Sequence, residues 1–167
     1  MSEEIERAIR EKKISKVVSC PSVPIQIDGI TAADAFDAGD CFGKITEIRV
    51  PLSGIIYSAT FWDFDDEGSQ IDLEIFKASI IQTASDAAWD PTDVDMLKFV
   101  TELAFVAFDD HISSRTSELT NIGKAYTAPD GKFWIQAVCR GTPNIAATAI
   151  PRFQLQIIPD DPDWLEV

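Results

Sequence analysis

Five residues in the stretch DFDDEGSQIDLE have the types and the spacing of a calcium-binding loop. Asp63, Asp65, Glu67, Gly68 and Glu74 stand at its positions 1, 3, 5, 6 and 12. In an EF-hand, oxygen ligands at these positions surround the ion, the glycine allows a sharp bend, and the carboxylate at position 12 binds with both oxygens. Taken alone, this spacing would indicate a calcium-binding protein.

The residues around this stretch favour a turn instead. Apolar and polar residues alternate before and after it, as in β-strands, whereas an EF-hand needs a helix on each side. With Leu73 facing the core, Glu74 should point outward, together with Asp72 and away from the turn. We therefore predict a hairpin in which Gly68 adopts the left-handed conformation. Binding of an adventitious cation between Asp63 and Glu74 stays open.

No other group of residues points to catalysis. The single histidine, His111, stands beside two aspartates in FDDHISS, and we interpret it as a surface or turn residue because no second histidine completes a metal site. The sequence contains no GxSxG, GxGxxG or GxxxxGKS/T motif, the patterns typical of many hydrolases and nucleotide-binding proteins. We therefore expect a protein with no enzymatic activity, no catalytic metal and no cofactor.

Cysteine usage indicates a reducing compartment. Cys20, Cys41 and Cys139 are odd in number and form no CxxC motif, so we predict buried free thiols rather than a disulfide framework or a zinc site. The N-terminal sequence MSEEIERAIREKK is charged throughout and lacks the apolar segment of a secretory signal. We expect the protein to be made in a cytoplasm.

The charge is unevenly distributed along the 167 residues. The formal net charge is −14, yet residues 1–16 carry five basic against four acidic side chains, a net of +1, which leaves −15 for the remainder. Phosphate backbones repel such an acidic body, because nucleic-acid affinity depends on Lys and Arg. No apolar run reaches the ~18 residues of a membrane-spanning helix. We expect neither a nucleic-acid nor a membrane partner.

The pattern of apolar residues predicts an all-β fold. Short runs rich in Ile, Val and aromatic residues, bounded by Gly, Pro, Asp or Ser, follow one another from Ile14 onward. In RFQLQII, Phe153, Leu155 and Ile157 alternate with glutamines, so one strand face should be buried and the other wet. Many such strands without long helices predict an antiparallel β-sandwich or jelly roll, with one helical turn near residues 92–97.

A short N-terminal arm, residues 1–16, should precede a single β-sandwich domain, residues 17–167. Residues 3–13 read as a helix with Ile5 and Ile9 on one face and Glu–Arg pairs at i, i+4 spacing. A helix of this length is not stable alone in water. We therefore predict that Ile5 and Ile9 lie on the surface of a neighbouring molecule.

The four tryptophans divide into two pairs. Trp62 and Trp134 lie in predicted strands, so we place them in the core. Trp89 lies in a polar loop and Trp164 at an acidic C-terminus, positions where tryptophan often anchors an interface or supports a bound sugar. Trp89 and Trp164 are therefore candidate interface residues, with packing of either ring on its own domain as the alternative.

Several phrases together resemble small virion proteins of tailed bacteriophages. They are ITAADAFDAGDCFGKITEIRVPLSGII, IDLEIF, SDAAWDPTD, AYTAPDGKFWIQAVCRGTPNI and QLQIIPDD, and they cover most of residues 28–161. This group includes head decoration (cement) proteins with a β-sandwich or jelly-roll fold, which sit on the capsid surface, often as trimers, and hold capsomers together. The resemblance implies a virion location and the major capsid protein as partner, and transfers no site residue.

A different class of function stays open beside this expectation. The same sandwich could be a carbohydrate-binding module of a phage fibre or spike that uses an exposed aromatic ring such as Trp89. The position of Trp89 separates the two functions. Burial of the ring against a partner would favour assembly, whereas a flat ring in an open polar groove would favour sugar binding.

Deletion of residues 1–13 tests the predicted arm. We expect the truncated protein to fold with an almost unchanged circular dichroism spectrum but to attach more weakly to the virus particle, since Ile5 and Ile9 are lost. Attachment as tight as that of the full chain would show that the arm is not an anchor. Failure to fold would show that the arm belongs to the core.

Overall fold

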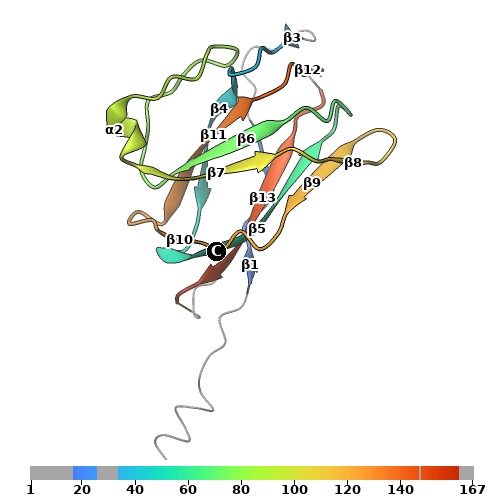
Figure 1. Cartoon of the computed structure of the whole chain (residues 1–167). Helices are drawn as coiled ribbons and strands as arrows, with labels where there is room; N and C mark the ends of the chain where they lie inside the picture. The colour runs from blue at the N-terminus through green and yellow to red at the C-terminus, as the bar shows by residue number, and fades with distance from the viewer. Residues whose placement is uncertain (1–16, 26–33, 147, 162–167) are drawn as a thin grey trace, which may run out of the picture.

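The computed structural model describes residues 17–25, 34–146 and 148–161. The predicted arm, with Ile5 and Ile9, and Trp164 lie outside these residues. Within them, two large antiparallel sheets face each other (Figure 1). The larger sheet has seven strands. Five of them follow one another in the spatial order β1 (Val18–Ser19), β13 (Arg152–Pro159), β5 (Ser53–Asp63), β9 (Arg115–Leu119) and β8 (Asp109–Asp110). The other two are β2 (Val23–Pro24), which also pairs with β13, and β10 (Lys124–Thr127), which also pairs with β5.

The second sheet has four strands within the described part of the chain. They are β4 (Cys41–Arg49), β11 (Lys132–Cys139), β6 (Ile71–Phe76) and β7 (Phe99–Phe105), in that spatial order. A small ladder pairs β3 (Asp34–Ala35) with β12 (Asn144–Ile145), and α2 (Asp93–Met96) is a single helical turn. All pairings are antiparallel, so the all-β prediction is confirmed.

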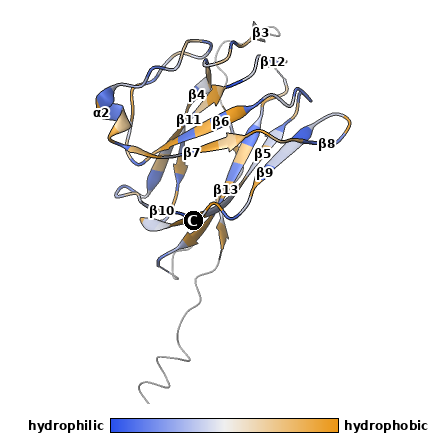
Figure 2. Cartoon of the chain, viewed as in Figure 1, coloured by the Kyte–Doolittle hydropathy of each residue, from blue (hydrophilic) through white to orange (hydrophobic). Residues whose placement is uncertain are grey.

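One core fills the space between the two sheets. Phe61 of β5 and Phe105 of β7 meet across it with ring centroids 5.4 Å apart, and buried apolar residues of both sheets form one cluster there. The strands of both sheets carry many of the apolar residues, which are orange in Figure 2. The predicted alternation in β13 is confirmed, because Phe153, Leu155 and Ile157 are fully buried while the glutamines between them are half-buried. Period-two burial of this kind places one strand face in the core.

The strand ends agree with the local signals. Thr92 accepts a hydrogen bond from the Asp95 N–H and begins α2, as predicted, and strand β7 follows. The turn before β11 contains Gly131 with φ of +64°, the left-handed conformation that glycine adopts without steric cost. Both features depend on residues close together in the chain, which explains why the sequence indicates them.

The predicted hairpin after Asp63 is wrong. Strand β5 belongs to the seven-stranded sheet and β6 to the four-stranded sheet, so residues 64–70 cross from one sheet to the other. Gly68 does have the expected left-handed conformation, with φ of +62°. A turn residue sets the local backbone angles, but the partners of the two strands are distant in sequence, and they decide whether the strands pair.

The tryptophans of the strands are not core residues. Trp62 and Trp134 lie in β5 and β11 as predicted, but both are half-buried and their neighbours Phe61 and Phe133 face the core instead. A strand alternates its faces, so only one of two adjacent large apolar residues can point inward. The smaller phenylalanine occupies the interior position in both strands.

The three cysteines are buried and form no disulfide, as predicted. Burial raises the pKa of the Cys41 thiol to about 11 and raises the pKa of Cys139 as well. A rise from the ordinary 9.0 to about 11 leaves roughly a hundredfold less thiolate at neutral pH, and only the thiolate is strongly nucleophilic. We therefore regard these thiols as apolar packing groups.

Thiol reactivity tests this assignment. In the folded protein at pH 8 we expect very slow reaction with a thiol reagent, because all three cysteines are buried and burial raises the pKa of the Cys41 and Cys139 thiols. After denaturation without reductant, three equivalents should react. A count of one would reveal a disulfide, and rapid reaction in the native state would contradict the burial.

Candidate functional site

A long irregular segment, residues 77–98, protrudes from one side of the sandwich and carries α2 at its outermost point (Figure 1). We call it the covering segment. It lies along β4, the edge strand of the four-stranded sheet, whose outward N–H groups need hydrogen-bond acceptors. Alternate N–H groups of β4 find them there: Cys41 N–H donates to Ala87 O (2.8 Å), Gly43 N–H to Ser85 Oγ (3.2 Å) and Ile45 N–H to Gln82 Oε1 (2.9 Å).

Trp89 fixes the covering segment over the outer face of the same sheet. Its main-chain N–H donates to Gly39 O (2.9 Å), and its ring packs edge to face against Phe76 of β6, with centroids 6.2 Å apart. The ring is half-buried and its Nε1 is fully buried. Trp89 therefore packs on its own domain, the alternative that the sequence left open.

Coverage by this segment buries a charged cluster on the outer face. Asp72 and Glu74 of β6 are only 2% and 7% exposed, which corrects the expectation that they point into solvent. Arg140, directly after β11, donates to Asp72 (2.5 Å) and lies 3.5 Å from both Glu74 and Glu102 of β7. The two carboxylates do occupy the face opposite Leu73, as alternation requires, but the chain returns to cover that face.

The environment of Glu74 favours its protonated form. Burial removes water from the carboxyl group and raises its pKa, and this effect exceeds the opposing influence of Trp89 and Arg140. The Trp89 indole N–H is close enough to favour the carboxylate but completes no hydrogen bond of normal geometry, so desolvation dominates. Gln136, the partner of Glu74 across the ladder, is fully buried beside it.

The helical turn α2 is held rigidly by one buried carboxylate. Asp95, 2% exposed, accepts hydrogen bonds from Thr92 Oγ1 (2.9 Å), Lys98 Nζ (2.8 Å) and the Ile81 N–H (3.3 Å). The Lys98 contact, followed by those of Thr92 and Ile81, lowers the pKa of Asp95. These bonds link the two ends of the covering segment. They stabilise α2, a single helical turn that would not be stable alone.

Around this anchor, apolar side chains face solvent. Leu97 is 80% exposed and Val94 is 65% exposed on the same side of the turn, three residues apart. Ile81, whose N–H reaches Asp95, is 66% exposed, and Met96 is 42% exposed. We call Ile81, Val94, Met96 and Leu97 the apolar patch. Exposed apolar residues gathered on a rigid support are typical of interaction surfaces.

The calcium-like stretch is a connection held by its own carboxylates. Asp63 is buried and accepts hydrogen bonds from the N–H groups of Asp65 (2.9 Å) and Gly68 (2.7 Å). The carboxylate of Asp65 accepts one from the Ala146 N–H (2.6 Å). Strands rather than helices flank the stretch, so it lacks the helical context of an EF-hand. Two of its acidic side chains accept hydrogen bonds from main-chain N–H groups, but the stretch connects two sheets and does not close the predicted hairpin.

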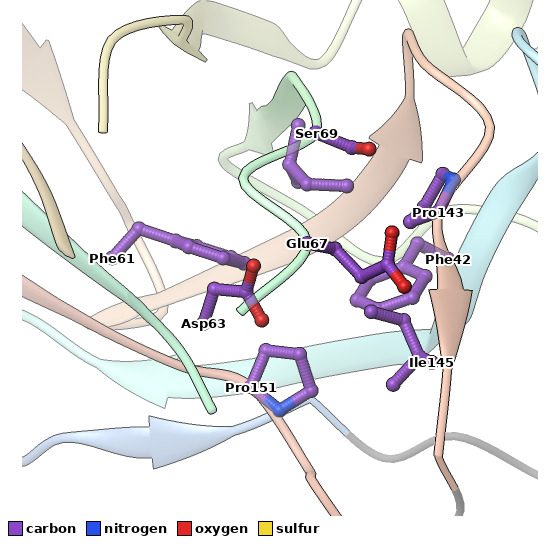
Figure 3. A pocket seen from close by; sticks show the side chains of 9 residues that line it. Phe42, Phe61, Asp63, Glu67, Ser69, Pro143, Ile145 and Pro151 are labelled. Atoms are coloured by element: carbon purple, nitrogen blue, oxygen red, sulfur yellow. The ribbon is translucent and has the colours of Figure 1, made fainter. Parts of the chain in front are cut away.

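A small pocket lies beneath this connection (Figure 3). Phe42, Ile145 and Pro151 line its apolar side, and Glu67 and Asp63 stand at its edge. Its volume of about 10 Å³ has room for about one water molecule. The pocket is therefore too small for a sugar or a nucleotide, which need several hundred Å³.

His111 is exposed in the turn between β8 and β9, as predicted, with Nε2 2.9 Å from Thr116 Oγ1. In the described part of the chain, no three His, Cys, Asp or Glu side chains converge in the manner of a metal site. Asp109 and Asp110 precede this histidine in the chain, but among the described residues they form no such group with it. His111 is thus a turn residue.

No family model, no curated protein sequence and no solved structure matches this chain. Among the residues described above, no helix has both the length and the apolar character to cross a membrane. The features of this chain that bear on its function are therefore its sequence and the geometry of the covering segment.

Sequence reasoning missed the apolar patch, although a signal for it exists. The stretch DVDMLKF places three apolar residues in a single helical turn, and one turn cannot direct all of them toward one core. The cluster around Arg140 leaves no such signal, because its members come from three separate strands or strand ends.

The substitution Glu74→Gln tests the buried carboxyl group. Because the folded state raises the pKa of Glu74, the unfolded state loses its proton first as the pH rises above about 4.5, and the free energy of unfolding should fall until the pH passes the folded pKa. Glu74→Gln should remove this contribution, so the variant should gain stability relative to wild type across that window. Thermal melting between pH 4 and 8 measures it.

Glu102→Gln is the matched control, since Glu102 lies at the same 3.5 Å from Arg140 but has an exposed side chain. We expect its melting temperature to follow the wild-type pH profile closely. A Glu74→Gln profile parallel to that of wild type would contradict the burial of an ionisable group at this position.

Proposed function

We propose that this protein is a non-enzymatic virion structural protein, specifically a capsid decoration (cement) protein of a tailed bacteriophage. In this role it binds the outer surface of the head through the major capsid protein and stabilises contacts between capsomers. It acts there as a homo-oligomer, most simply a trimer, with its sandwich arranged as a jelly roll. The virion phrases in residues 28–161 and the all-β architecture support this proposal.

The apolar patch is the observation on which the proposal mainly rests. Val94 and Leu97 stand out from the body on a turn that Asp95 holds in place, so little conformational freedom is lost when a partner covers them. Preorganised apolar anchors of this kind contribute most of the affinity in protein interfaces. An assembly protein needs such a surface, whereas the pocket beneath Glu67 has no room for a substrate.

The charge distribution supports a protein partner with a basic surface. The body of the chain carries most of the net charge of −14, and Asp90 and Asp93 are exposed next to the apolar patch. Complementary charge steers association and suppresses wrong partners. The region of the capsid protein that receives the patch should therefore be apolar with Lys and Arg at its rim.

The carbohydrate-binding alternative gains no support from Trp89. Sugar platforms present a ring in an open groove, whereas the indole of Trp89 packs against Phe76 and its Nε1 is buried beside Glu74. The aromatic group that motivated this alternative serves to hold the covering segment. We therefore keep assembly as the proposed function.

The double substitution Val94→Thr/Leu97→Gln tests the proposal. Each change keeps the approximate size of the side chain but makes it polar. We expect binding to phage heads that lack the protein to weaken by at least roughly 10- to 100-fold, since burial of even one Val or Leu contributes about 1.5–3 kcal/mol. Co-sedimentation with the heads measures the affinity, and the melting temperature should hardly change.

Leu52→Gln provides the control, because Leu52 is 63% exposed but lies in the turn between β4 and β5, outside the patch. It should bind the heads as tightly as wild type. Undiminished binding by the double variant would show that the apolar patch is not the attachment surface. If the wild-type protein does not bind heads at all, the proposed function is wrong.

A further inference from the structure

A second exposed apolar residue stands at the opposite side of the molecule from α2. Strands β8 and β9 are joined by a tight turn, residues 111–114, which projects from the sandwich (Figure 1). Ile112 at its tip is 94% exposed, the highest value among the exposed large apolar side chains of the described residues. The neighbours His111 and Ser113 are exposed too, although His111 Nε2 lies 2.9 Å from Thr116 Oγ1 of β9.

Ile112 is also conformationally strained. Its φ of +77° lies in the left-handed region, where a β-branched side chain crowds the backbone. The other non-glycine residues with positive φ in the described ranges are Asp66, Asp86 and Asn121, types that tolerate this conformation. The chain elsewhere follows conformational preference, and Ile112 is the exception.

The turn itself does not require isoleucine. It is closed by the His111 N–H, which donates to Ser114 O (2.9 Å), and by the Ile112 N–H, which donates to the Asp110 carboxylate (2.9 Å). Asparagine or glycine would make the same main-chain bonds with less strain. Neither folding preference nor core burial accounts for the side chain, so a contact outside the chain is the remaining physical reason for it.

We propose that Ile112 is an apolar plug that inserts into a pocket of a partner protein whose rim carries Lys and Arg. The β8–β9 turn presents it rigidly, because both ends of the turn are hydrogen-bonded. A single branched side chain at the end of a narrow turn fits a concave apolar site better than a flat surface. The plug is separate from the apolar patch and enters the partner from the other side of the sandwich.

The charges around the tip decide what kind of partner it fits. Asp109 and Asp110 are exposed beside Ile112, and the nearest lysine or arginine along the turn, Arg115, is already paired with Asp66 (2.8 Å). The tip is therefore negative around an apolar centre, and a basic rim complements it. A second copy of this chain would bring the same acidic groups to the contact, which disfavours self-association through the plug.

This inference rests on the proposed function for the identity of the partner, the phage head. With the apolar patch on one side and Ile112 on the other, one molecule can contact two neighbouring capsomers at once. Such double attachment is what a cement protein requires, and it would raise the overall affinity beyond that of either contact.

The substitution Ile112→Asn tests the plug in two ways. Relief of strain should raise the melting temperature by about 2 °C or more, while binding to heads that lack the protein should weaken at least tenfold. Ile112→Val, which keeps an apolar branched side chain, should retain most of the affinity and the wild-type melting temperature. Co-sedimentation and differential scanning fluorimetry of the full chain provide the two measurements.

The possible outcomes distinguish a failure of the plug proposal from a failure of the proposed function. If wild type binds heads and Ile112→Asn binds equally well, the plug is wrong while the proposed function stands. If Ile112→Asn lowers the melting temperature, the strain is not real and the plug is likewise overturned. If Ile112→Asn abolishes self-association but not binding to heads, the occupant is a second copy and not the partner described here. Absence of wild-type binding to heads would overturn the proposed function and its partner together.

Discussion

The outer edge of strand β4 must find hydrogen-bond partners, and much of the structure depends on how it does so. The N–H groups of Cys41, Gly43 and Ile45 point away from β11. They donate instead to acceptors of the covering segment, which are a main-chain carbonyl, a serine hydroxyl and a glutamine side-chain carbonyl. An unprotected edge would be a template for aggregation. Once residues 77–98 are held against this edge, Trp89 reaches the outer face and α2 is carried outward.

The same coverage creates the main electrostatic feature of the fold. Asp72 and Glu74 are removed from water, and one cation, Arg140, serves both as well as Glu102. One arginine cannot neutralise three carboxylates, so the cluster is less costly when Glu74 holds its proton. The segment that bears the apolar patch therefore lies over a group whose ionisation state depends on pH.

Two exposed apolar features then stand on opposite sides of an acidic body. The patch around Leu97 is supported by the buried carboxylate of Asp95, and Ile112 is supported by the hydrogen bonds of a tight turn. Hydrogen bonds hold both features in place, and exposed aspartates border both of them. The small pocket lined by Phe42, Ile145 and Pro151, with a volume of about 10 Å³, belongs to neither of these two features.

The sequence by itself determined the features that depend on near neighbours. The alternation in β13, the helical turn near residues 92–97, the left-handed Gly68 and the buried cysteines all follow from side-chain period, capping and turn chemistry. Tertiary structure alone decided that β5 and β6 join different sheets, that Glu74 is covered, and that Phe61 and Phe133 take the interior in place of their tryptophan neighbours. The physical reason is that strand pairing and the coverage of a sheet face are set by segments far apart in the chain, whose contacts leave no periodic signal in the sequence.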